Sequence, residues 1–163
     1  MAEFNWNKLN ISDKEKTERF TATQIGKELD EPAAEFIAGY TKAYSLQAGE
    51  VICHQGDDSS YLCIITRGRA NIIKTDSEGN EKILGSVGPG QPLGELSLFD
   101  TQPRSASAVA TSVVEMLVLE QMSFDLLFEN NTRVWGKLIK PLVKSITKRF
   151  RQTSGLLAEY LKY

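Results

Sequence analysis

The sequence has few of the residues that form disulfide frameworks or metal clusters. Its 163 residues include two cysteines, Cys53 and Cys63, and one histidine, His54. Two cysteines are too few for a disulfide-rich scaffold or a four-cysteine metal site. Cys53 and His54 are consecutive in an expected strand, so their side chains should point to opposite faces. We therefore expect no metal site, no prosthetic group, two buried thiols that act as small apolar residues, and a reducing, cytoplasmic location.

The chain also lacks long apolar runs and an excess of either charge. No apolar run approaches the ~18 residues that a membrane-spanning helix needs. The 19 Lys and Arg residues are balanced by 21 Asp and Glu residues, giving a net charge of −2. A nucleic-acid-binding chain normally shows a basic excess. The N-terminal stretch MAEFNWNKLNISDKEK has no basic segment followed by an apolar one, unlike a secretory signal. We therefore expect neither a membrane nor DNA as a partner.

The N-terminal residues 1–44 are predicted to be helical. Ser12 and Glu15 have the spacing of a capping box, which places a helix start at Ser12. Pro32 suits the first turn of a second helix that continues through PAAEFIAGYTKAY.

The C-terminal residues 120–163 are also predicted to be helical. Ser123 is the expected N-cap of a first helix there. Apolar or small residues then recur every three or four positions from Trp135 to Tyr160, which indicates one continuous stripe on a long helix. Pro141 should kink or divide that helix.

Residues 45–119 have the short apolar runs and frequent glycines of a β structure. The runs 51–53, 62–65, 70–73, 83–84 and 113–119 predict strands, and SEGN at 77–80 predicts a hairpin turn. We expect an α+β fold with an eight-stranded antiparallel β-roll or jelly-roll barrel, flanked by N-terminal helices and a long C-terminal helix. The whole chain, 1–163, should form one domain.

The segment 88–109, GPGQPLGELSLFDTQPRSASAV, combines a glycine-rich turn, an isolated acid and a base that follows a proline. It resembles the phosphate-binding cassette of cyclic nucleotide-binding domains, a family that includes the catabolite activator protein and the regulatory subunits of cyclic-nucleotide-dependent kinases. The most specific element is Gly94-Glu95-Leu96 with Pro103-Arg104-Ser105-Ala106 at the family's spacing. LQAGEVICHQGD and YLCIITRGRANI resemble the preceding strands. The likeness covers about residues 44–150, and Leu93 stands where the family usually has an aromatic residue.

The resemblance implies a site for a cyclic nucleotide, cyclic AMP or cyclic GMP. Arg104 would grip the phosphate with its planar guanidinium, and Glu95 would accept a hydrogen bond from the ribose 2′-hydroxyl. A short helical turn after Gly94 would present backbone N–H groups to the phosphate. In the empty pocket, Glu95 and Arg104 should partly neutralise each other. The expected ligand-binding residues are Gly94, Glu95, Leu96, Ser97, Arg104, Ser105, Ala106, Thr153 and Ser154.

The C-terminal helix supplies the last part of that prediction. In the family this helix covers the base, and Thr153 and Ser154 occupy the comparable positions in KRFRQTSGLL. The apolar stripe exceeds what one barrel needs, so we expect a homodimer through this helix. The sequence stops at Tyr163 without the winged helix-turn-helix of the family's transcription factors, which disfavours a DNA-binding regulator.

The expected function is therefore that of a non-catalytic cyclic nucleotide receptor that signals through its C-terminal helix to an effector protein. The sequence does not decide whether the site prefers adenine or guanine, because the hydroxyl of Ser105 can reach a guanine edge. The alternative is a ligand-independent interaction scaffold on the same fold, or a member that binds a different anion. A phosphodiesterase is disfavoured because no nucleophile–base pair or metal cluster stands out.

Overall fold

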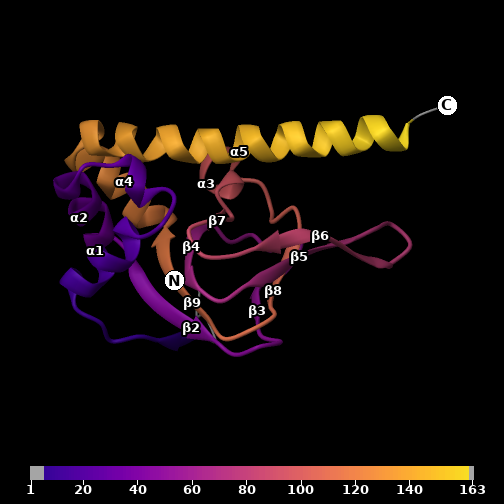
Figure 1. Ribbon diagram of the computed structural model, residues 1–163, viewed down its shortest axis with the longest axis horizontal. Coiled ribbons are helices and arrows are strands. Elements are labelled where there is room, and N and C mark those ends of the chain that lie inside the picture. The colour runs from indigo at the N-terminus through magenta and orange to yellow at the C-terminus, as the bar shows by residue number, and fades with distance from the viewer. Residues whose placement is uncertain (1–5, 162–163) are drawn as a thin grey trace.

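The computed structural model describes residues 6–161 of the chain (Figure 1). The two ends of the predicted helical zones, residues 1–5 and 162–163, lie outside this range. In chain order the elements are β1 (Asn7–Lys8), α1 (Asp13–Thr21), the 3₁₀ turn η1 (Gly26–Glu28), α2 (Glu31–Gly39), β2 (Lys42–Leu46), β3 (Val51–Cys53), β4 (Tyr61–Arg67), β5 (Ala70–Thr75), β6 (Glu81–Val87), β7 (Pro92–Leu93), α3 (Leu96–Asp100), β8 (Ser107–Ala110), β9 (Val114–Glu120), α4 (Gln121–Asn130) and α5 (Thr132–Tyr160).

Two antiparallel sheets face each other. One has the strand order β1-β2-β9-β4-β7 and the other has the order β3-β8-β5-β6. Figure 1 shows the N-terminal helices and α4 packed together at one end of the sheets, with α5 lying across the top and extending past them. The expected fold class is confirmed, with nine strands rather than eight within residues 6–161.

The five-stranded sheet is buried on both faces, which explains the unbroken apolar runs of β4 and β9. Successive side chains of a strand point to opposite faces. In β4, Cys63 and Ile65 point into the core between the sheets, whereas Leu62 and Ile64 pack against the helices. The same alternation in β9 separates residues of the two cores. This sheet is therefore the wall that joins the sandwich to the helical layer.

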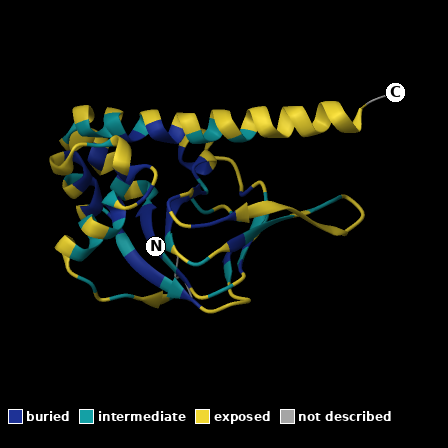
Figure 2. Cartoon of the chain, viewed as in Figure 1, coloured by how far each residue is buried: buried dark blue, intermediate teal, exposed yellow. Residues whose placement is uncertain are grey.

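The start of α5 is anchored in the helical layer. Leu138 and Leu142 are fully buried there, and Pro141 between them is buried too. Pro141 was expected to kink or divide the helix, and it does not divide it: α5 is one helix through Pro141. Packing of its apolar face compensates for the lost backbone hydrogen bond, as tertiary contacts commonly do for helices. From Phe150 onward every described residue of α5 is exposed (Figure 2).

Ion pairs hold the same part of α5 to the N-terminal helices. Lys137 contacts Asp30, the N-cap of α2, and the Nζ of Lys144 lies 2.5 Å from a carboxylate oxygen of Glu28 in η1. Both pairs are largely exposed, so they orient the helix more than they stabilise it.

Two helix boundaries differ from expectation. The second helix ends at Gly39, and Lys42 to Tyr44, predicted to be helical, belong instead to β2, which pairs with β9 over its whole length. Helix α4 begins at Gln121, so Ser123 lies inside it and is not its N-cap. The N-cap is Glu120, whose carboxylate pairs with Lys42 at 2.8 Å and makes no capping hydrogen bond.

The other local predictions hold. The side chain of Ser12 accepts a hydrogen bond from the backbone N–H of Glu15, and Pro32 lies in the first turn of α2. The carboxylate of Glu15 accepts hydrogen bonds from Arg19, so only the N-cap half of the capping box is used as expected.

No helix within residues 6–161 combines the length and apolar character that crossing a membrane requires.

Leu142 should be a principal anchor of α5. Leu142→Ala removes a fully buried side chain and should lower the free energy of unfolding by about 2–5 kcal/mol. Leu126 on α4 is 42% exposed, so Leu126→Ala should cost about 1 kcal/mol or less. Urea unfolding followed by circular dichroism measures both, and equal losses would show that α5 is not anchored at Leu142.

Candidate ligand-binding cleft

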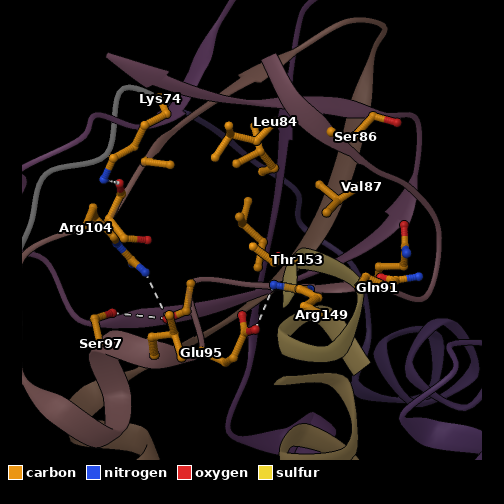
Figure 3. A pocket seen from close by; sticks show the side chains of 18 of the residues that line it. Lys74, Leu84, Ser86, Val87, Gln91, Glu95, Ser97, Arg104, Arg149 and Thr153 are labelled. Atoms are coloured by element: carbon orange, nitrogen blue, oxygen red, sulfur yellow. Dashed lines mark hydrogen bonds and ion pairs between the residues drawn. The ribbon is translucent and has the colours of Figure 1, made fainter. Parts of the chain in front are cut away.

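A cleft of about 1080 Å³ lies between the four-stranded sheet, the segment from β7 to β8 and the second half of α5. One side is apolar and comes mainly from β5 and β6, whereas the floor is polar and comes from the turn around α3. Figure 3 shows Leu84 and Val87 across the cleft from Glu95 and Ser97, with Thr153 between them. The apolar lining residues are Ile72, Leu84, Val87, Leu93, Leu96 and Leu156.

The floor of the cleft begins at Gly94, which takes a left-handed backbone conformation with a φ of 80°. A Cβ atom there would lie 2.0 Å from the Nη1 of Arg104 and 2.9 Å from the carbonyl oxygen of Tyr61. Only glycine therefore allows the guanidinium this close to the chain. The short helix predicted after Gly94 is present as α3, and the hydroxyl of Ser97 donates back to the Gly94 carbonyl at 3.1 Å.

Arg104 is buried beneath the floor, with 5% of its surface exposed. Its Nη1 donates to the Gly94 carbonyl at 2.9 Å, and its Nη2 donates to the Tyr61 carbonyl at 2.8 Å. Its Cζ lies 4.1 Å from the centroid of the Tyr61 ring. The Nε is buried without a hydrogen-bond partner. A buried donor without a protein partner is unfavourable, and a ligand in the adjoining cleft is one source of the acceptor that it needs.

Glu95 is also buried, with 2% of its surface exposed. Its carboxylate accepts a hydrogen bond at 2.7 Å from the Nη1 of Arg149 on α5 (Figure 3). Arg149 also donates to the carbonyl of Pro92. Glu95 and Arg104, which are expected to neutralise each other in part, therefore form no direct ion pair, and each has other partners. Arg104 is held by carbonyl groups beneath the floor, whereas α5 brings a different guanidinium to the carboxylate from above.

Arg149 is the site residue that the sequence reasoning missed. It precedes Thr153 by four residues, so the two lie on the same face of α5. That spacing could have identified it, because Thr153 was expected to face the ligand. The stripe from Trp135 to Tyr160 contains apolar and small residues only, and Arg149 lies beside it.

The structure brings eight of the nine predicted residues to the cleft. Gly94, Glu95, Leu96, Ser97, Arg104, Ser105, Ala106 and Thr153 line it, whereas Ser154 does not. Ser105 and Thr153 are exposed, which leaves their hydroxyls accessible from the cleft. The carbonyl of Ser105 accepts a hydrogen bond from the Nζ of Lys74 at 2.5 Å, which ties this segment to β5.

The cysteines are buried, as expected. Burial raises the pKa of the Cys53 thiol, and the nearby Arg104 guanidinium opposes that rise only in part. Burial also raises the pKa of Cys63 above its usual value. Both thiols therefore stay neutral near pH 7 and pack as small apolar groups. Within residues 6–161, no three His, Cys, Asp or Glu side chains are grouped so that they could hold a metal ion.

The arrangement suits one kind of small molecule. A buried guanidinium with a free donor can bind an anionic group, and a buried carboxylate can accept a hydrogen bond from a hydroxyl group. The apolar wall formed by β5 and β6 can pack against a flat ring, since binding sites commonly combine an apolar lining with a few polar groups.

Known proteins share this architecture. A family model described as the cyclic nucleotide-binding domain matches residues 44–131. The cyclic AMP receptor protein of Thermus thermophilus is 41% identical over 71 residues, which are 44% of this chain and 33% of that protein. The CRP-like cAMP-activated global transcriptional regulator of Mycobacterium tuberculosis is 28% identical over 138 residues, which are 80% of this chain and 57% of that protein.

Among solved structures, a cyclic nucleotide-binding domain from Methylobacillus flagellatus superposes with a TM-score of 0.85 at 24% identity. The match covers 97% of this chain and 90% of that one, so the likeness of fold extends over nearly the whole chain. The chain spans between a third and three fifths of the length of the two curated relatives above.

The close approach of Gly94 to Arg104 can be tested apart from backbone strain. Gly94→Ala and Gly49→Ala both place a side chain at a positive φ, but only Gly94 has neighbours within 4 Å of the added Cβ. Gly49→Ala should therefore lower the free energy of unfolding by about 1–2 kcal/mol. Gly94→Ala should cost about 1–3 kcal/mol more, because Arg104 must move. Equal losses in urea unfolding would contradict this packing.

Proposed function

The chain belongs to the cyclic nucleotide-binding domain family, and on this premise we propose that it is a non-catalytic receptor for a cyclic purine nucleotide, cyclic AMP or cyclic GMP. The observation that carries the proposal is the buried Arg104, whose Nε has no partner beside the cleft. The phosphodiester of a cyclic nucleotide carries one negative charge and supplies the acceptor that this donor lacks.

The remaining groups are assigned to the rest of the nucleotide. Glu95 would accept a hydrogen bond from the ribose 2′-hydroxyl through the same carboxylate that binds Arg149. The base would lie between the wall formed by Leu84 and Val87 and the face of α5 that carries Thr153. The hydroxyl of Ser105 would contact the phosphate or, for cyclic GMP, the guanine edge.

Signalling would pass through α5. Arg149 is the last half-buried residue of this helix, and it shares Glu95 with the proposed ribose site. A ligand that binds Glu95 would therefore alter the contact at which the exposed second half of α5, residues 150–160, begins. These residues are called the free half of α5. The ligand shifts the helix toward the position that contacts it best, and the helix presents that position to an effector protein.

The free half of α5 is proposed to pair with a second copy of the chain. Phe150, Leu157 and Tyr160 are 70%, 57% and 86% exposed and continue the apolar stripe that begins at Trp135. A contiguous apolar stripe on a long helix suits a helix–helix dimer. Both cysteines are free and buried, which supports a reducing, cytoplasmic location for this dimer.

Calorimetric titration tests the receptor proposal directly. Cyclic AMP and cyclic GMP are titrated separately, and at least one should bind with a Kd of about 1 µM or tighter, equivalent to about −8 kcal/mol. Arg104→Ala should weaken binding about 100-fold or more, because it removes the buried partner of the phosphate. Arg133→Ala makes the same change of charge on an α5 residue outside the cleft and should alter the Kd less than about threefold.

Two results would count against the receptor. If neither nucleotide binds at concentrations that reveal a millimolar site, the fold serves as a ligand-independent scaffold or binds another anion. If both cation variants weaken binding equally, the effect arises from general electrostatics and Arg104 is not the phosphate ligand.

Sedimentation equilibrium tests the proposed dimer. Leu157→Asp places a charge in the apolar stripe and should convert the dimer into a monomer, since burying an unpaired carboxylate is strongly unfavourable. Thr147→Asp places the same charge on an exposed residue of α5 outside the stripe and should leave the dimer intact. A monomeric wild type, with and without nucleotide, would contradict the pairing.

A further inference from the structure

The buried charge of Arg104 has no opposite charge paired with it among the described residues. The side chain is 95% buried, and none of the ion pairs between described residues includes it. The nearest expected partner, Glu95, is bound to Arg149 instead. Burying a cation without an opposite charge is unfavourable. Neutral groups must therefore stabilise this guanidinium while the cleft is empty.

Tyr61, the first residue of β4, contacts the guanidinium with two different groups. Its carbonyl oxygen accepts a hydrogen bond from Nη2 at 2.8 Å, and its ring centroid lies 4.1 Å from Cζ. A carbonyl dipole and the face of an aromatic ring both attract a cation. One residue thus supports the cation through its backbone and through its side chain.

The ring of Tyr61 is itself held in place. Its hydroxyl donates to the carbonyl of Ile52 at 2.7 Å, and its ring meets that of Trp6 edge-on at 5.4 Å. Only 4% of its surface is exposed. The ring is therefore held in one position, and it limits where the guanidinium of Arg104 can lie beneath the cleft floor.

We propose that Tyr61 is the positioning residue of Arg104, and that its ring and carbonyl hold the buried guanidinium without neutralising it. The link to a nucleotide rests on the proposed function, whereas the support of the cation does not. A carboxylate partner would cancel part of the charge that attracts the phosphate. A ring and a carbonyl carry no net charge, so the full charge of Arg104 remains available to the incoming anion.

The first test compares two substitutions by calorimetric titration with cyclic AMP and cyclic GMP. Tyr61→Phe keeps the ring and loses only the hydroxyl, so affinity should fall less than about threefold. Tyr61→Leu keeps the carbonyl and apolar bulk but removes the ring, so affinity should fall about tenfold or more. Equal affinities for the two variants would overturn the role of the ring in binding.

The second test needs no ligand. Urea unfolding of the wild type, Tyr61→Leu, Arg104→Met and the double variant forms a thermodynamic cycle. Tyr61→Leu should raise the unfolding equilibrium constant about tenfold more when Arg104 is present than when it is methionine, as for a desolvated cation–ring contact. Equal effects in both backgrounds would show that Tyr61 is a packing residue only.

The two tests separate the two proposals. If the wild type binds neither nucleotide, the receptor function fails, and the unfolding cycle alone decides whether Tyr61 supports the cation. If the wild type binds and the cycle shows no coupling, the receptor stands and the role of Tyr61 is overturned.

Discussion

The buried guanidinium of Arg104 holds two distant parts of the chain together beneath the cleft. Its two hydrogen bonds require the carbonyls of Gly94 and Tyr61 to converge on one point. Convergence on the first side is possible only because residue 94 has no Cβ, which would lie 2.0 Å from Nη1. On the second side the carbonyl belongs to Tyr61, the first residue of β4. The turn before α3 and the start of β4 thus both contact this one cation beneath the cleft floor.

Local signals were enough to predict much of the fold. The alternating and continuous apolar runs gave the central strands, because burial on one or both faces leaves that pattern in the chain. Gly79 takes a positive φ at the turn between β5 and β6, where the sequence indicated a hairpin. The helical turn after Gly94 and the cap at Ser12 were likewise visible, since each depends on residues within a few positions.

The features that could not be predicted depend on distant residues. Tyr44 follows a helical segment without a break in pattern, yet it forms a strand because β9, some seventy positions later, pairs with it. The partner of Glu95 is decided in the same way. Arg104 is nine residues away and Arg149 is 54 residues away, and only the placement of α5 shows that the second reaches the carboxylate. Sequence distance favours the wrong partner because it contains no information on helix docking.

The position of Arg149 along α5 has a consequence for how the helix and the cleft influence each other. Before this residue the helix is fixed by Leu138 and Leu142 in the core; after it, every described residue is exposed. The contact of Arg149 with Glu95 therefore lies where the anchored half meets the free half. Under the proposed function, the ribose and Arg149 would contact the same carboxylate, so the ligand and the helix would be coupled through Glu95. Such a coupling is reciprocal. If the nucleotide changes the affinity of α5 for a partner by some factor, that partner changes the affinity for the nucleotide by the same factor.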